Sequence, residues 1–179
     1  MKFKFNIKLN DKDYLDYNVF WMMKSHYGKR QWIKLRLFLI LPFAIISLLP
    51  LISKEYSPQN VIIPSIIILA LVQVLLKPIY IWTLKTHIKT LKKSGKMGYS
   101  PISDIEFYEE SFIEITADNK TEQKYSAIER VSVITNMVIY IHVNNLMSYI
   151  LPFHCFESKE QLNVFLDFIK TKCVDIDIY

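Results

Sequence analysis

Two apolar runs decide the fold of this chain: LFLILPFAIISLLPLI at residues 37–52 and VIIPSIIILALVQVLL at residues 61–76. A helix needs about 20 apolar residues to cross a bilayer, and apolar residues flanking both runs supply the missing turns. Since the chain has only 179 residues, it holds too little other structure to bury two helices that are apolar on every side. We therefore predict a hairpin of two transmembrane helices, at about residues 35–52 and 61–82.

The basic residues predict how this hairpin is oriented. Five lysines and arginines lie at residues 24–36 and six lysines at residues 77–96, whereas the connecting loop at residues 53–60 holds one lysine. Because segments rich in Lys and Arg stay in the cytoplasm, this asymmetry predicts a multi-pass protein with both termini cytoplasmic. Trp32 and Trp82 would then lie at the same level, at the inner interface of the membrane.

The segment before the hairpin has the pattern of a strand followed by a helix. Residues 2–9, KFKFNIKL, alternate between apolar and polar side chains, as in a half-buried strand. A lone strand is unstable, so we expect this one to pair with an exposed edge of a sheet formed by the C-terminal residues. Asn10 is the predicted N-cap of the following helix, which we expect Gly28 to loosen or end.

Behind the hairpin the pattern changes to short strands and one closing helix. Ser158 and Gln161 have the spacing of a capping box and open an amphipathic helix. Asn144 and Asn145 are typical of a tight turn between two strands. The strands are predicted at residues 102–107, 112–116, 121–125, 128–134, 137–143 and 146–151.

These elements predict an α+β membrane protein with four segments. Residues 1–34 hold the N-terminal strand and a juxtamembrane helix, and residues 35–82 hold the transmembrane hairpin. A basic helix and a linker with two glycines follow at residues 83–99. We predict that residues 100–179 form a small antiparallel β-sheet or barrel capped by the C-terminal helix. This order of elements fits a pleckstrin-homology-like (PH-like) fold.

Several short motifs carry a family resemblance. They are the helix start NDKDYL at residues 10–15, YSAI at residues 125–128 and YILPFHCF at residues 149–156, followed by Glu157-Ser158 at the start of the last helix. On these motifs the whole chain resembles the YcxB-like family of small bacterial membrane proteins. The resemblance implies a protein of the bacterial plasma membrane with a PH-like domain in the cytoplasm. It does not point to any particular activity.

Two positions depart from the pattern of that family. Ser126 stands where the family often has tryptophan, and Phe153 and His154 stand where it often has a basic pair. If that pair contacts a phosphate or an acidic partner in relatives, the contact is weakened in this chain.

No arrangement of residues in the sequence predicts an enzyme or a metal site. The chain has three glycines, too few for a phosphate-binding loop, and it lacks the common hydrolase, metalloprotease and kinase motifs. His154 and Cys155 are adjacent, and we expect them to point to opposite faces of a strand rather than to one metal. We therefore predict no enzymatic activity and no cofactor.

The basic stretch after the second apolar run is the candidate functional site. Its lysines either hold the hairpin in its orientation only, or also contact anionic lipid headgroups. Nucleic acid is not an expected partner, because aromatic residues are not interleaved with the lysines as base stacking requires. The candidate lipid contacts are Lys85, Lys89, Lys92, Lys93 and Lys96.

From these features we expect a membrane-anchored adaptor or regulator whose PH-like domain binds a protein partner or a lipid headgroup. The alternative is an accessory subunit of a transporter or channel complex. Two spans without a charge inside the membrane cannot form a conduction path alone, so this alternative requires a homo-oligomer or another membrane protein.

Overall fold

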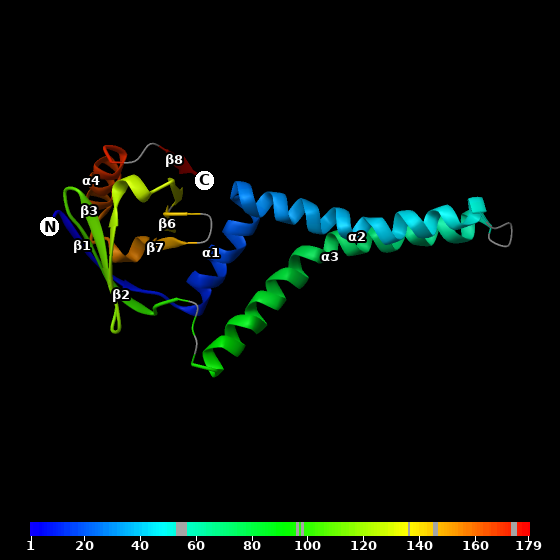
Figure 1. Cartoon of the computed structure of the whole chain (residues 1–179), viewed down its shortest axis with the longest axis horizontal. Helices are drawn as coiled ribbons and strands as arrows, with labels where there is room; N and C mark the ends of the chain where they lie inside the picture. The colour runs from blue at the N-terminus through cyan, green and yellow to red at the C-terminus, as the bar shows by residue number, and fades with distance from the viewer. Residues whose placement is uncertain (53–56, 96, 98, 136, 145–146, 173–174) are drawn as a thin grey trace. The chain divides into compact units, whose positions relative to one another are not determined.

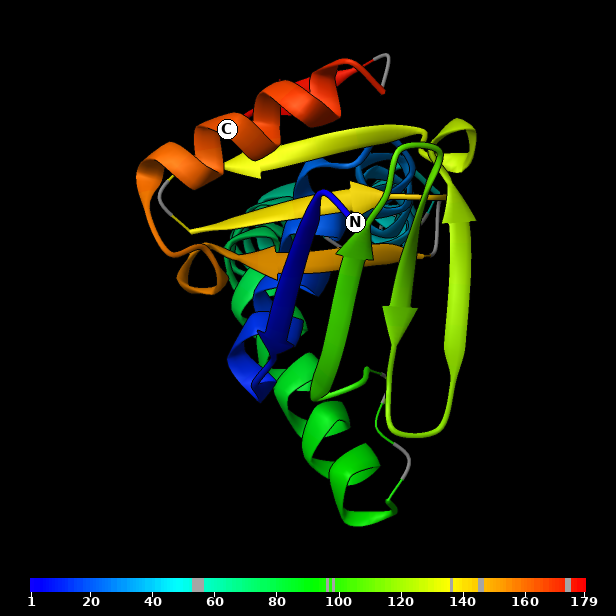
Figure 2. The same cartoon turned by 90° about the vertical axis from the view of Figure 1, so that its left-hand side faces the viewer.

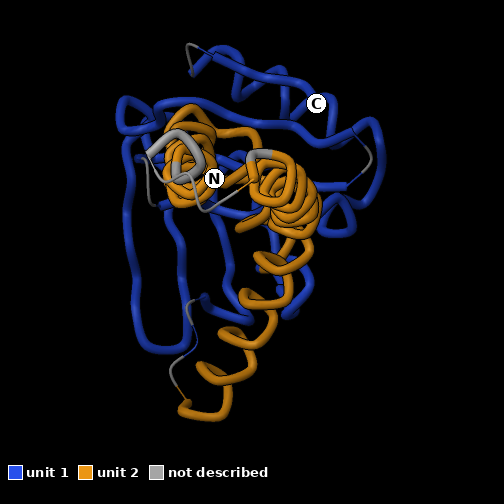
Figure 3. Tube along the Cα trace, turned by 90° about the vertical axis from the view of Figure 1, so that its right-hand side faces the viewer, with its two compact units in different colours: residues 1–14, 97–179 blue, residues 15–96 orange. Residues whose placement is uncertain are grey.

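The chain folds into two compact units. The computed structural model describes residues 1–52, 57–95, 97, 99–135, 137–144, 147–172 and 175–179. One unit combines residues 1–14 with residues 97–179, and the other consists of residues 15–96 (Figure 3). The first unit is therefore built from both ends of the chain, and the second is an insertion within it.

The first unit contains two four-stranded sheets (Figures 1 and 2). One sheet is antiparallel in the order β1-β2-β3-β4, with β1 at Phe3–Lys8, β2 at Ile102–Phe107, β3 at Ser111–Ile115 and β4 at Lys120–Lys124. The other has the order β7-β6-β5-β8, with β5 at Arg130–Ile134, β6 at Val138–His142, β7 at Ser148–Pro152 and β8 at Ile176–Ile178. Helix α4, Lys159–Lys170, lies between β7 and β8 in the sequence.

The structure confirms the six predicted strands behind the hairpin and corrects their surroundings. There are two sheets rather than one small sheet or barrel, and β8, which was not predicted, pairs parallel with β5. Tyr125–Ala127 and Phe153–Cys155 are short 3₁₀ helices, so Tyr125 does not extend a strand and His154-Cys155 is not part of one. The predicted turn at Asn144-Asn145 falls partly on Asn145, which lies outside the described residues.

The N-terminal strand pairs with the C-terminal part of the chain, as the sequence predicts. β1 is antiparallel to β2, with Phe3 opposite Phe107 and Lys8 opposite Ile102. Figure 2 shows the two strands side by side. The Leu9 amide also donates to the Pro101 carbonyl at 2.9 Å. A strand that precedes the hairpin thus completes a sheet whose other strands all follow it.

Alternation along β1 explains why it belongs to the core. Phe5 and Ile7 are 1% exposed, whereas Lys4 points outward and pairs with Asp104 and Glu106 at 3.2 and 2.9 Å. The ring of Phe165 from α4 lies 5.1 Å from that of Phe5 and 4.9 Å from that of Phe107. Helix α4 therefore packs on the first sheet through a cluster of aromatic rings.

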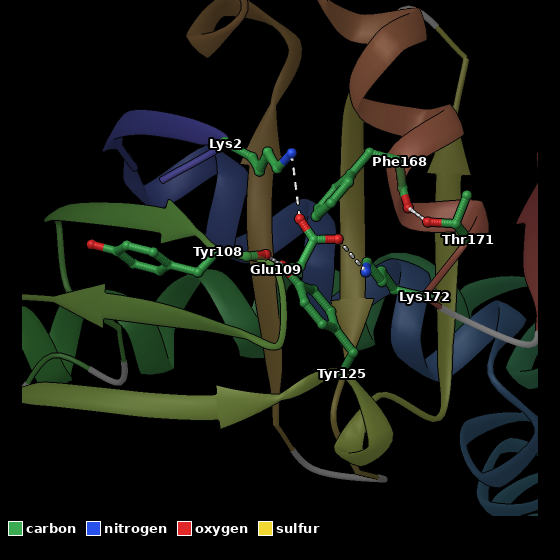
Figure 4. A network of polar contacts seen from close by, with 7 residues as sticks. All are labelled: Lys2, Tyr108, Glu109, Tyr125, Phe168, Thr171 and Lys172. Atoms are coloured by element: carbon green, nitrogen blue, oxygen red, sulfur yellow. Dashed lines mark hydrogen bonds and ion pairs between the residues drawn. The ribbon is translucent and has the colours of Figure 1, made fainter.

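Both ends of α4 are fixed by polar contacts. At its start the Gln161 amide donates to Ser158 Oγ at 3.2 Å, and Gln161 Oε1 accepts from the Glu157 amide at 2.8 Å, much as the capping box predicts. Past its end, Lys172 pairs with Glu109 at 2.9 Å, and Glu109 also pairs with Lys2 at 3.4 Å (Figure 4). The turn between β2 and β3 thus binds the segment that follows α4.

The second unit consists of helices, which are α1 at Asp11–Lys24 from Leu15 onward, α2 at His26–Ile52 and α3 at Pro58–Lys93. The start of α1 is as predicted, because Asn10 Oδ1 accepts from the amides of Lys12 and Asp13 at 2.8 and 3.1 Å. The predicted effect of Gly28 on this helix is wrong: α1 ends at Lys24, and Gly28 lies in the first turn of α2.

Gly28 and Ser25 explain the corner between α1 and α2. Ser25 Oγ accepts from the Gly28 amide at 2.9 Å and so caps the start of α2. A Cβ atom at Gly28 would meet the Trp21 carbonyl and would lie 2.7 Å from Met22 Cα. Only glycine allows the two helices to meet this closely.

Helices α2 and α3 have the length and composition of membrane-crossing helices, over residues 26–48 and 59–93. Their apolar side chains are largely exposed; Phe38 is 71% and Val74 74% exposed. Helices in the core of a soluble protein bury such side chains instead. The protein is thus an α+β protein with two long apolar helices, followed by strands that form two sheets and by a C-terminal helix.

Candidate membrane-surface site

The end of α3 beyond Trp82 presents a basic face. Lys85, Lys89, Lys92 and Lys93 follow the spacing i, i+4, i+7 and i+8, which places them on one side of a helix. All four side chains are exposed, whereas Ile88 is 6% exposed. The structure therefore brings together the four candidate lysines that it describes, and Lys96 lies outside the described residues.

This basic segment is a regular helix with a defined end. The hydroxyls of Thr83, Thr86 and Thr90 each donate to the carbonyl four residues earlier at 3.0 Å. Gly95, with φ at 70°, lies just past the end, and its amide donates to the Lys92 carbonyl at 3.2 Å. Two lysines in the last turn also suit the negative end of the helix dipole.

Aromatic residues mark one level at the base of the α2–α3 hairpin. The ring centroids of Trp32 and Tyr80 are 5.6 Å apart, and Trp82 lies about 3 Å further along α3. Trp82 is 68% exposed, and Trp32 is buried with Arg36 5.5 Å from its ring. From Trp32 to the end of α2 the helix rises about 30 Å, which is the thickness of the hydrocarbon core.

The polar residues within the helices do not form a site of their own. The Ser65 hydroxyl donates to the Val61 carbonyl of the same helix at 2.7 Å. The amide nitrogen of Gln73 is buried and has no hydrogen-bond partner among the described residues. A path for ions or polar solutes through the bilayer would require more polar groups than these.

Asp11, Tyr14 and Tyr99 form a cluster within the first unit, which we call the neck because it is close in sequence to both ends of the inserted segment. The Tyr99 hydroxyl donates to Asp11 Oδ1 at 2.8 Å, and the rings of Tyr99 and Tyr14 stack at 4.8 Å. Burial, together with the bond to Asp11, raises the pKa of Tyr99 to about 12. This cluster was not predicted, because its two sides are 88 positions apart in the sequence and no local pattern links them.

A buried histidine joins three strands of the second sheet. Its ring nitrogens lie 2.7 Å from Ser148 Oγ and 3.0 Å from Ser132 Oγ, so His142 connects β6 to β7 and β5. Burial and then the charge of Arg130 lower the pKa of His142 to about 4, and its ring is neutral at physiological pH. These contacts give His142 a structural role in the sheet.

The described residues hold no reactive or metal-binding cluster. Burial raises the pKa of Cys155 to about 12, which keeps it a thiol and a poor nucleophile. Within the described ranges, no three His, Cys, Asp or Glu side chains lie close enough to hold a metal ion. The basic face of α3 therefore remains the candidate site.

Comparison with known proteins identifies a family domain within the first unit. Residues 107–169 match the model of the YcxB-like proteins. This region is a YcxB-like domain. It runs from the end of β2 to Ile169, the last residue but one of α4, and it leaves out β1 and the inserted helices. No curated protein and no solved structure matches the chain.

Proposed function

We propose that the protein is a membrane-anchored adaptor or regulator whose YcxB-like domain lies at the cytoplasmic surface and binds a protein partner or a lipid headgroup. The pairing of β1 with β2 carries this proposal. Two hydrogen-bonded strands lie on one side of a membrane, so the insertion between them crosses it an even number of times. The two long apolar helices satisfy this condition.

The strand order supports a PH-like fold for the whole first unit. An antiparallel sheet of β1 to β4 is followed by β5 to β7 and then by α4. In this interpretation β1 is the first strand of the domain, and α1 and the α2–α3 hairpin are inserted between β1 and β2. Such a domain is held at the membrane at two adjacent points, which suits a binding module that has to stay at the surface.

The basic face supports a contact with anionic lipid. Lysines near the surface of an anionic membrane each gain up to about 1 kcal/mol, so four lysines on one helix face form a strong electrostatic contact. The exposed Trp82 lies one turn before Lys85, where the ring would reach the headgroup region. The lysines that flank both helices support a cytoplasmic location of this face.

Fluorescence of the full chain in lipid nanodiscs tests the lipid contact. Replacing Trp21 and Trp32 by Phe leaves Trp82 as the only tryptophan. We expect brominated phosphatidylglycerol to quench Trp82 more strongly than brominated phosphatidylcholine at equal bromine content. Replacing Lys85, Lys89, Lys92 and Lys93 by Gln should abolish this preference.

A matched variant controls for net charge. Lys8, Lys120, Lys124 and Lys159 are exposed residues of the first unit, and replacing them by Gln removes the same charge. This variant should keep the preference for phosphatidylglycerol. Equal quenching by both lipids in the starting chain, or an equal loss in both variants, would show that the α3 face has no specific contact with anionic lipid.

A further inference from the structure

Strand β8 is a short addition to the edge of the second sheet. It pairs parallel with β5, with Val131 opposite Ile176 and Val133 opposite Ile178. The Val131 amide donates to the Asp175 carbonyl at 3.0 Å, and the Tyr179 amide donates to the Val133 carbonyl at 2.9 Å. The Thr135 hydroxyl also donates to the Tyr179 carbonyl, at 3.1 Å. The backbone of this segment thus pairs with β5 along its length.

The side chains of β8 add little burial. Ile176 packs against the hydrophobic core but stays partly exposed, and it is the only β8 residue in that contact among those described. Ile178 lies on the same side of the strand and is 74% exposed, and Tyr179 is 41% exposed. A segment held mainly by backbone bonds and one aliphatic side chain can leave an edge without opening the core.

Helix α4 has several contacts that do not involve β8. Lys172 pairs with Glu109 and lies 5.6 Å from the ring centroid of Phe168, while the Thr171 hydroxyl donates to the Phe168 carbonyl at 2.7 Å (Figure 4). Phe165 and Ile169 are fully buried. We therefore expect α4 to keep its place up to Lys172 when the residues after it detach.

Without β8, strand β5 would expose an aliphatic edge. The backbone groups of Val131, Val133 and Thr135 face this edge. Val131 and Thr135 donate their amides to the residues on either side of β8, and Val133 accepts from the Tyr179 amide. An edge strand of this composition is a template for an added strand, which proteins otherwise cover or charge. The outer strand of the first sheet, β4, carries lysines at both ends instead.

We propose that the β5 edge is a docking site for an extended segment of a partner protein, and that residues 175–179 occupy this site until the partner displaces them. The proposal rests on the function proposed above and names the class of protein partner. The sequence of β8 defines the chemistry of the occupant. It carries an aliphatic residue at the position of Ile176, acidic residues on both sides of it, and backbone amides at the positions of Asp177 and Tyr179 that donate to β5.

Binding of a synthetic peptide tests the proposal in the full chain and in a chain that ends at residue 174. The probe is a fluorescent peptide of residues 172–179 with serine in place of Cys173, and its anisotropy is followed in detergent solution without anionic lipid. We expect at least tenfold tighter binding to the shortened chain, because in the full chain the edge is already occupied. A peptide with Ile176→Asp should bind at least tenfold more weakly than the probe.

Backbone methylation separates strand pairing from other modes of binding. A methyl group on the Tyr179 nitrogen removes the amide that bonds Val133, whereas the Ile178 amide points away from β5. Methylation at Tyr179 should abolish binding, and methylation at Ile178 should leave it within about twofold. Equal effects of the two modifications, or equal binding to both chains, would overturn the proposal.

Hydrogen exchange in the full chain tests how readily β8 detaches from β5, without a truncated variant. Amides of Val131, Val133 and Thr135 face β8, and those of Ser132 and Ile134 face β6. We expect the first group to exchange at least tenfold faster than the second. Equal exchange in both groups would show that β8 is a permanent strand. A dimer of the full chain that disappears on removal of residues 175–179 would identify a second copy as the occupant and contradict the proposal.

Because the peptide assay contains no bilayer and no anionic lipid, its outcome is separate from that of the lipid contact. Loss of peptide binding with an intact lipid preference would remove the β5 edge site and leave the anchored lipid-binding role. The opposite pair of results would leave a peptide-binding domain without the proposed contact at α3.

Discussion

At the scale of single residues, burial makes His142 sensitive to acid. It is held neutral between two serine hydroxyls, with its pKa lowered to about 4 from an unfolded value of about 6.5. A lowered pKa means that its contribution to stability is present above pH 6.5 and is lost as the pH falls toward 4. Protonation would also leave one serine hydroxyl facing a second N–H donor.

We predict that the first unit loses about 2 kcal/mol of stability between pH 7 and pH 5 through His142. Denaturant unfolding at several pH values measures this slope. His142→Asn should flatten the slope whatever its cost at pH 7, whereas His154→Asn, at an exposed histidine, should keep it. An unchanged slope in His142→Asn would assign the acid sensitivity to other groups.

The lysines of α3 and the residues of the neck differ in how far the sequence predicts them. The four lysines of α3 were predicted as a group, because a helix places residues at this spacing on one face. The neck formed by Asp11, Tyr14 and Tyr99 was not predicted. Its residues come together only when β1 pairs with β2, and a single sequence contains no signal for such a distant contact.

At the scale of elements, the corner between α1 and α2 depends on Gly28. We predict that Gly28→Ala destabilises the helical unit, because a methyl group would press on the backbone of α1. Thermal unfolding in detergent, followed by circular dichroism, measures the effect. Gly95→Ala is the control: it has free space for the methyl group and should cost only about 1–2 kcal/mol of backbone strain. A smaller effect at Gly28 than at Gly95 would contradict the described corner.

The pairing of β1 gives a second prediction at this scale. The Phe5 ring contacts the rings of Phe107, Phe156 and Phe165 at centroid distances of 5.9, 4.6 and 5.1 Å. Phe5→Asp buries a charge there, at a cost of several kcal/mol, which is comparable to the stability of a small domain. We expect the first unit to unfold in this variant.

The neighbouring residue on β1 provides the control. Lys4 points outward and makes exposed ion pairs, so Lys4→Ala should change the free energy of unfolding by no more than about 1 kcal/mol. Near-ultraviolet circular dichroism, which reports on the packing of the aromatic core, measures the unfolding of both variants. Equal stability of both variants would show that β1 is not part of that core.

The longer strands were predictable and short elements were not. β1 was found because its apolar and polar residues alternate, and β2 to β7 were found as short runs between turn residues. β8 has three residues and follows a helix closely, so its alternation is too short to distinguish it from a tail. The 3₁₀ helices at Tyr125–Ala127 and Phe153–Cys155 were missed because their residues also suit strands.

At the scale of the whole molecule, the domain is discontinuous in sequence. Its first strand is separated from the second by the entire helical insertion, yet the two strands are hydrogen-bonded neighbours. Synthesis therefore has to complete the hairpin before β1 can find β2. The family match covers residues 107–169 only, and β1 lies outside it although it belongs to the same core.

An insertion between two paired strands requires both ends of the helical segment to lie on the same side of the membrane, and labelling of single cysteines in intact cells measures this. Variants without Cys155 and Cys173 carry one cysteine at Lys12, Gln59 or Lys170, all of which are exposed. A reagent that cannot cross membranes should label position 59 in sealed cells, and it should label positions 12 and 170 only after lysis. Labelling of position 12 and position 170 on opposite sides of the membrane would contradict the pairing of β1 with β2.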